Sequence, residues 1–281
     1  MEFTSAEGEQ RYAELVRAAS GCVVALDFDG TLSPIVDDPT QAYIHPDAGD
    51  VLVALARQVL AVAVVTGRPA RQVLALGGLE EVGGAVAEAG KELYVFGQYG
   101  NERWSSANRR IISPRPPRGL ATFLDELPEL LRQADAADAW IEEKGLAVAV
   151  HTRRLPDAHE AFGRLLPLVR ERAERHELTV EPGRNVVEVR SPGMHKGVAV
   201  ETLARELDAR AFLFAGDDLG DVEAFHAVRA LREQGLPTLL VCAGSEEEGS
   251  LEPLSDVVVK GPEGVLQLLR QLAADAAALH A

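Results

Sequence analysis

The chain has 281 residues, and its 28 Lys and Arg against 44 Asp and Glu give a formal charge of −16. A field of that sign repels nucleic acid and anionic membrane surfaces, so neither is expected as a partner. No apolar stretch is long enough for a bilayer span, and the N-terminus lacks the pattern of a secretory signal. Cys22 and Cys242 lie in apolar runs without metal or disulfide spacing, which fits a reducing compartment. We expect a cytoplasmic protein, and we expect it to be a monomer.

The first third of the chain alternates apolar strand-like runs with helical patterns. Strands alternating with helices predict a parallel sheet with right-handed crossovers. The apolar runs are short and rich in β-branched residues, as in strands that are buried on both faces. Helices are predicted over 9–20, over 47–58 and from about 69, and strands over 23–26, 59–65, 84–88 and 92–96.

The pattern changes after residue 100. Residues 101–119 hold five Arg against one Glu, together with three Pro, which predicts a crossover between domains. Two helix–hairpin pairs follow and predict an α+β module with an antiparallel sheet. The helices are expected over 118–134 and 157–176, and the hairpins over 139–151 and 178–190.

From residue 191 the α/β alternation returns. The predicted fold class is therefore α/β: a Rossmann-like core with a parallel sheet, interrupted by an inserted α+β unit with an antiparallel sheet. The core is expected to comprise residues 1–105 and 192–281, and the insertion residues 106–191. The returning elements are helices at 196–207 and 221–233, strands at 211–215, 238–242 and 256–259, and a C-terminal helix.

Polar groups gather where the predicted strands end. Asp27-Phe28-Asp29-Gly30-Thr31 follows the first strand, and Thr66-Gly67-Arg68 follows the second. Ligands of open parallel sheets bind at the carboxyl ends of the strands. Each segment alone has an ordinary explanation, since an Asp at a strand end often caps a helix and a Gly there is commonplace.

Two later segments complete the set. Lys196 begins a predicted helix, and Gly216-Asp217-Asp218-Leu219-Gly220-Asp221 follows an apolar run. Carboxylates without His or thiolate partners suit Mg²⁺. Asp27 and Asp217 can ligate the ion, the backbone carbonyl of Asp29 can join them, and Asp218 can ligate directly or through water. Mg²⁺ and Lys196 would let an acidic protein accept a phosphate.

The order of these four motifs resembles the haloacid dehalogenase-like phosphatase superfamily. The resemblance implies that Asp27 is a nucleophile that forms an aspartyl-phosphate. It implies that Asp29 is the general acid and base. It also implies that Thr66, with the backbone of the Gly67–Arg68 loop, binds phosphate oxygens, and that Lys196 binds both Asp27 and the phosphate.

A second set of motifs comprises Asp27 to Pro39 and, in the inserted unit, Glu142-Glu143-Lys144-Gly145 and the segment around Glu188. The first segment resembles the opening of the trehalose-6-phosphate phosphatases, and the other two resemble the C2-type cap of that family. The resemblance implies a Mg²⁺-dependent hydrolase that converts trehalose 6-phosphate to trehalose and phosphate in trehalose biosynthesis. The substrate-binding residues that it implies are Gly67, Arg68, Asn101, Glu142, Lys144, His151, Arg153, Glu188 and Arg190.

The fourth motif departs from the family pattern, because Gly220 and Val222 stand where Thr and Glu are usual. This leaves the carboxylates in place but puts helix capping and support of the metal in question. Two alternatives stay open from the sequence. One is a cap-bearing phosphatase for a sucrose- or mannosylglycerate-type sugar phosphate, and the other is a non-catalytic sugar-phosphate sensor. The cap charges can also be read as solvated hairpin faces.

Overall fold

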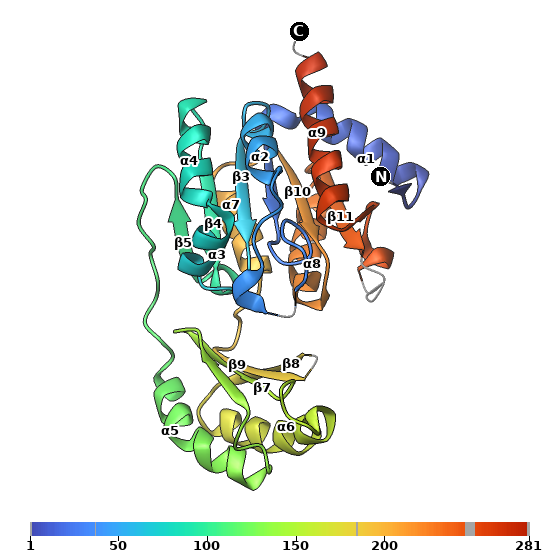
Figure 1. The fold of residues 1–281 in the computed structure, drawn as a ribbon. Coiled ribbons are helices and arrows are strands. Elements are labelled where there is room, and N and C mark those ends of the chain that lie inside the picture. The colour runs from blue at the N-terminus through green and yellow to red at the C-terminus, as the bar shows by residue number, and fades with distance from the viewer. Residues whose placement is uncertain (1, 37, 184, 245–250, 280–281) are drawn as a thin grey trace. The chain divides into compact units, whose positions relative to one another are not determined.

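The structure is a computed structural model that describes residues 2–36, 38–183, 185–244 and 251–279. The chain forms two compact units (Figure 1). The larger unit takes the chain up to Ser113 and from His195 onward, and the smaller unit is Pro114–Met194. The sequence placed these boundaries at 105/106 and 191/192. Within the described residues no helix is both long and apolar enough to cross a membrane.

The larger unit is built on an eight-stranded sheet in the order β1-β12-β11-β10-β2-β3-β4-β5. The inner strands are parallel, and each edge strand pairs antiparallel with its neighbour. The strands are β1 (Glu2–Phe3), β2 (Cys22–Leu26), β3 (Ala61–Val65), β4 (Leu93–Gly97), β5 (Glu102–Ser105), β10 (Ala211–Gly216), β11 (Thr238–Gly244) and β12 (Val257–Lys260).

Helices cover both faces of this sheet, which explains why its central strands read as unbroken apolar runs. In β2, Val24 and Leu26 point into one hydrophobic cluster, and Val23 and Ala25 point into the other. The first cluster is closed by α1 (Ala6–Arg17), α2 (Ala48–Ala56), α3 (Ala70–Gly77), α4 (Leu79–Glu88) and α9 (Gly261–Leu279). The second is closed by α7 (Gly197–Glu206) and α8 (Val222–Glu233), as Figure 1 shows.

Two local predictions were wrong. The strand expected over 84–88 is the second half of α4, where Leu79, Gly83 and Val86 lie buried at helical spacing. Its small apolar residues suggested a strand, although the same spacing fits one buried helix face. Within the expected crossover 101–119, residues 102–105 instead form β5, which pairs with β4 and buries Trp104.

The smaller unit is a four-stranded antiparallel sheet in the order β6-β7-β9-β8. Its strands are β6 (Trp140–Glu143), β7 (Ala147–His151), β8 (Thr179–Gly183) and β9 (Val186–Arg190), and its helices are α5 (Arg118–Gln133) and α6 (Ala158–Arg175). Alternate residues such as Val148 and Val187 pack in one cluster with the helices. The residues between them, such as Glu142 and Glu188, occupy the opposite face. The predicted fold class is therefore confirmed.

Candidate active site

Three predicted site residues follow parallel strands at the same edge of the large sheet. Asp27 follows β2, Thr66 follows β3 and Asp217 follows β10. The strands are adjacent in the sheet, and the Asp27 amide donates a hydrogen bond to the Ala215 carbonyl of β10 at 2.8 Å. The sheet register thus brings together groups that lie far apart in the sequence.

A buried carboxylate cluster occupies this edge. One carboxylate oxygen from each of Asp27, Asp217 and Asp221 lies within 4.8 Å of the others, and the residues are 3%, 6% and 0% exposed. The Nζ atom of Lys196 lies 2.6 Å from Asp27 Oδ1 and 2.7 Å from Asp221 Oδ1. One ammonium thus faces three buried carboxylates, which leaves negative charge to be compensated.

The backbone at Gly30, in the turn that follows Asp27, packs closely against the Asp217 side chain. Gly30 has a φ of +72°, and a Cβ on it would stand 1.9 Å from Asp217 Oδ2. The positive φ disfavours any residue with a side chain, and the short distance to Asp217 leaves no space for a Cβ atom. The close approach of Asp217 therefore requires glycine at position 30.

Asp221, which the sequence analysis did not select as a metal ligand, belongs to the cluster. A 3₁₀ turn, η4 (Leu219–Asp221), brings its carboxylate back over the strand end, where Asp221 Oδ2 accepts from the Asp217 amide at 3.1 Å. Asp218 is exposed and accepts from the Gly220 amide at 2.9 Å, which caps the same turn. The repeat of Asp residues after β10 was the available signal, but turn geometry decides which of them points inward.

Burial and mutual repulsion raise the pKa of each clustered carboxyl group. For Asp27 burial is the larger cause, with the charge of Asp221 next, and the pKa stands well above the usual range. Burial, followed by the charges of Asp218 and Asp221, raises the pKa of Asp217 to about 8. Burial opposes the charge on Lys196, but the Asp221 and Asp27 carboxylates outweigh it and raise its pKa. The site therefore favours an added positive charge.

The donor set fits a hard divalent cation. Among the described residues, three carboxylates and no His or Cys converge in the cluster. Mg²⁺ is bound by few carboxylates, with water completing its shell. Asp27, Asp217 and Asp221 are the residues that would hold it. Asp29, expected to join through its backbone carbonyl, lies two residues beyond Asp27 in the same turn.

Asp29 directs its carboxylate to Arg68. The Nε and Nη2 atoms of Arg68 each donate to one Asp29 oxygen at 2.7 Å. Thr66 is buried, and its Oγ1 accepts from the Arg68 amide at 3.1 Å. At Gly67 a Cβ would stand 2.8 Å from the Tyr99 ring. The loops after β3 and β4 therefore pack together. Within the loop after β4, Asn101 donates to the Gln98 carbonyl at 2.9 Å.

In the smaller unit the register aligns Glu142, Ala149 and Glu188 across three strands. Lys144 Nζ lies 2.6 Å from Glu188 Oε2, and His151 Nε2 lies 2.9 Å from Glu142 Oε2. The carboxylates predicted to bind sugar hydroxyls thus share one face, each beside a group that can donate a hydrogen bond.

The same face holds further predicted and unpredicted residues. Arg190 Nη1 lies 3.4 Å from Glu188 Oε1, and Arg190 Nη2 lies 3.0 Å from Glu181 Oε2. Trp140, which sequence reasoning missed, stacks on the His151 ring with centroids 4.4 Å apart. Arg153 is exposed, and its neighbour Arg154 lies over the Trp140 ring instead. An aromatic residue two positions before Glu142 was the available signal.

Comparison with known proteins agrees with the motifs. The family model described as Trehalose-phosphatase matches residues 25–260. The chain belongs to the trehalose-phosphatase family. The resemblance drawn from the sequence is confirmed, and the match extends from β2 through the smaller unit to β12.

Curated relatives of this chain include longer proteins. An uncharacterised glycosyl hydrolase of Mycobacterium tuberculosis is 33% identical over 279 residues, covering 95% of this chain and 19% of its own length. Trehalose-phosphate phosphatase B of Arabidopsis thaliana is 28% identical over 242 residues, covering 80% of this chain and 60% of its own length. The chain thus spans about a fifth of the mycobacterial relative and three fifths of the plant one.

Solved structures share the fold of this chain. The C-terminal domain of Candida albicans trehalose-6-phosphate phosphatase has a TM-score of 0.76 at 18% identity, covering 97% of this chain and 98% of that one. A haloacid dehalogenase-like hydrolase from Bacteroides thetaiotaomicron has a TM-score of 0.62 at 13% identity, covering 89% and 98%. At these identities the likeness establishes the fold.

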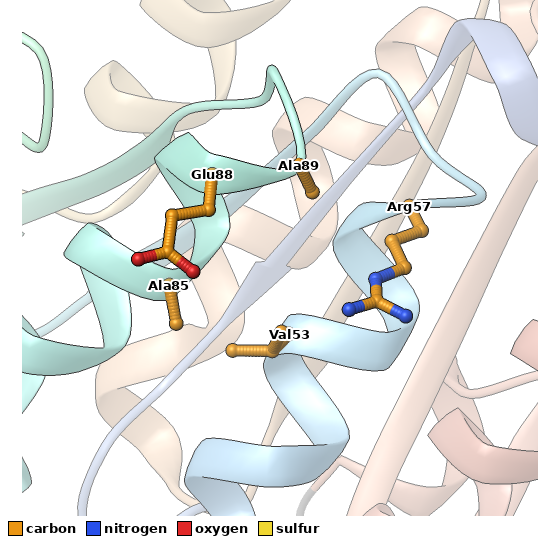
Figure 2. Close-up of a pocket in the computed structure, with 5 residues that line it drawn as sticks. All are labelled: Val53, Arg57, Ala85, Glu88 and Ala89. Carbon is orange, nitrogen blue, oxygen red and sulfur yellow. The ribbon is translucent and has the colours of Figure 1, made fainter.

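A hollow of about 480 Å³ in the larger unit lies away from the carboxylate cluster. Figure 2 shows it between α2 and α4, lined by Val53, Arg57, Ala85, Glu88 and Ala89. These residues belong to the C-terminal halves of α2 and α4 or directly follow them, and both helices precede strands, β3 and β4. The hollow therefore belongs to the amino edge of the sheet. The chemistry expected at the carboxyl edge does not use it.

Proposed function

We propose that this chain is a Mg²⁺-dependent phosphatase that hydrolyses trehalose 6-phosphate to trehalose and phosphate. The observation that carries the proposal is the buried Asp27 carboxylate after the central strand, 2.6 Å from Lys196 and clustered with Asp217 and Asp221. The family match supplies the substrate class. The sugar phosphate is the small-molecule partner that such a site requires.

Asp27 is the nucleophile of the proposed reaction. Its oxygen forms a bond to phosphorus while the bond from phosphorus to the sugar oxygen breaks, which leaves an aspartyl-phosphate. The Asp29 carboxyl gives its proton to the departing sugar oxygen. Water then attacks phosphorus, Asp29 takes up a proton from that water, and Asp27 is released with inorganic phosphate. Protons, atoms and charge balance over the two steps.

Lys196 holds the nucleophile in place. Its Nζ contacts both Asp27 and Asp221, so the ammonium fixes one Asp27 oxygen and offsets the charge of two carboxylates. Lys196 is itself buried, where charge compensation is strong because little water screens it. Bound Mg²⁺ would supply the remaining positive charge for a phosphate dianion.

Sugar recognition is proposed for the polar face of the smaller unit, which serves as the specificity cap. Glu142, Lys144 and Glu188 are grouped there, with His151 and Arg190 as neighbours. Carboxylates and an ammonium can accept and donate hydrogen bonds to sugar hydroxyls. A site built in this way rejects esters that lack those hydroxyls.

The test is phosphate release from a panel of esters, measured with Mg²⁺ and with EDTA. The panel contains trehalose 6-phosphate, sucrose 6-phosphate, glucose 6-phosphate, mannosyl-3-phosphoglycerate and p-nitrophenyl phosphate. We expect the highest kcat/KM for trehalose 6-phosphate and its loss in EDTA. Preference for another sugar phosphate would overturn the assignment of trehalose 6-phosphate as the substrate. Full activity in EDTA would overturn the proposed dependence on Mg²⁺.

A further inference from the structure

Arg68 makes an unusually complete set of hydrogen bonds at the edge of the candidate site. Its Nε and Nη2 atoms donate to Asp29 Oδ2 and Oδ1, both at 2.7 Å, and its Nη1 donates to the Pro39 carbonyl at 2.8 Å. The Arg68 side chain is 13% exposed, whereas that of Asp29 is 40% exposed. The planar guanidinium therefore holds both oxygens of a carboxylate that otherwise faces solvent.

The backbone that carries Arg68 is itself fixed. Its amide donates to Thr66 Oγ1 at 3.1 Å, and its carbonyl accepts from the Gln98 amide at 2.8 Å. Arg68 also directly precedes Pro69 and the first turn of α3. The guanidinium thus projects from a rigid strand-to-helix connection and links it to both ends of the segment from Asp29 to Pro39.

Asp29 depends on this contact for its orientation. In the described parts of the chain, Arg68 is the group whose side chain hydrogen-bonds the Asp29 carboxylate. A half-exposed aspartate without such a partner samples several side-chain rotamers. General acid catalysis requires the carboxyl group within hydrogen-bond reach of the leaving oxygen, so rotamer freedom lowers the rate.

We propose that Arg68 is a positioning residue for Asp29, whose guanidinium fork sets the orientation of the carboxyl group that protonates the leaving oxygen. The inference rests on the proposed function, and it assigns Arg68 a task beyond binding the phosphate.

Leaving-group chemistry separates positioning from phosphate binding. An alkoxide leaves poorly without a proton, whereas p-nitrophenolate leaves readily without one. A residue that orients Asp29 therefore matters far more for alkyl phosphates than for p-nitrophenyl phosphate. Loss of a residue that only binds phosphate raises KM for all esters alike, because the phosphoryl group is common to them.

The test compares Arg68→Gln and Arg68→Lys with Arg71→Gln, which removes a charge from an exposed position in α3. The substrates are a series of aryl and alkyl phosphates graded by leaving-group acidity, measured with Mg²⁺. For Arg68→Gln we expect kcat to fall about 100-fold with alkyl phosphates and less than about fivefold with p-nitrophenyl phosphate. Arg71→Gln should match the wild type throughout.

Arg68→Lys tests the fork itself. A single ammonium cannot hold both Asp29 oxygens in one plane, so this variant should show the same steepened dependence on the leaving group. Equal losses along the series, a rise in KM alone, or a Lys variant with wild-type behaviour would overturn the proposal. A crystal structure of Arg68→Gln with Asp29 unmoved would also overturn it.

Failure of the proposed function is distinguishable from failure of this inference. If the wild type prefers another ester to trehalose 6-phosphate, the substrate proposal falls and the leaving-group series still reports on Arg68. If the wild type hydrolyses no phosphate ester while circular dichroism shows a folded protein, both proposals fall together.

Discussion

The Asp221 carboxylate accepts a hydrogen bond from Lys196 Nζ at 2.7 Å and is fully buried, although Asp221 follows β10 by five residues. The closer residue Asp218 faces outward and caps η4. Three carboxylates therefore meet only because the 3₁₀ turn reverses the chain. That turn decides which aspartate joins Asp27 and Asp217 in the cluster.

Asp221→Asn should weaken Mg²⁺ binding much more than Asp218→Asn. Asp221 contributes an oxygen to the cluster, so its neutralisation should cost at least about tenfold in affinity. Asp218→Asn keeps a capping side chain, since Asn caps helical turns as well as Asp does. Isothermal titration of both variants with Mg²⁺ checks this. Equal losses, or a larger loss for Asp218→Asn, would contradict the arrangement of the cluster.

The stability of the metal-free protein should fall as pH rises towards 8. The pKa of Asp217 is raised from 3.8 to about 8, so the native state keeps a proton that the unfolded chain releases between these values. This contribution is complete below about pH 4 and is lost as pH passes about 8. We expect Tm in EDTA to decline more steeply from pH 5 to 9 for the wild type than for Asp217→Asn.

Magnesium provides the control for this pH dependence. A cation that binds the ionised cluster stabilises the native state by mass action, so its effect on Tm should grow with pH. Parallel wild-type and Asp217→Asn curves in EDTA would show that the carboxyl group does not carry the effect. A magnesium shift that shrinks as pH rises would argue against binding at the carboxylates.

Gly30→Ala should damage both stability and metal binding. The new Cβ would meet Asp217 Oδ2 at 1.9 Å, and a φ of +72° costs an L-residue about 1–2 kcal/mol even where space exists. Urea denaturation and Mg²⁺ titration measure the two effects. Gly163→Ala is a matched control, because it lies within α6 with nothing within 4 Å of its Cβ. That change should stabilise the protein by about 0.5–1 kcal/mol.

The core of the site could be predicted because its residues follow buried runs whose length and composition are visible in the sequence. Asp27, Thr66 and Asp217 each come directly after such a run, and parallel strands bring their ends to one edge. The sequence could not predict that the Asp221 side chain points into the cluster while Asp218 points outward. That difference depends on the φ and ψ angles of the turn between them.

Errors elsewhere have equally local causes. Residues 84–87 are small and apolar, so their pattern fits a strand or a helix until the burial of Leu79 and Val86 on α4 decides between them. The alignment of Glu142 with Glu188 depends on strand register, because a one-residue slip would move the side chains of one strand to the other face of the sheet. Sequence pattern alone placed both residues in hairpins without pairing them.

Lys144→Met should destabilise the smaller unit more than removal of an exposed ion pair does. Lys144 and Glu188 are 2.6 Å apart with side chains only 16% and 8% exposed, so the variant leaves a buried carboxylate short of a partner. The expected loss in urea denaturation is about 1–3 kcal/mol. Arg132→Gln, which breaks an exposed pair with Glu129 on α5, should change stability little.

The double variant Lys144→Met/Glu188→Leu separates the cost of an unpaired charge from the worth of the pair. Replacement of both partners by apolar side chains removes the buried carboxylate, so the double variant should be more stable than Lys144→Met alone. It should also lose turnover of trehalose 6-phosphate while p-nitrophenyl phosphate hydrolysis persists, since the proposed sugar contacts are gone. A double variant less stable than the single one would show that Glu188 supports the sheet independently of Lys144.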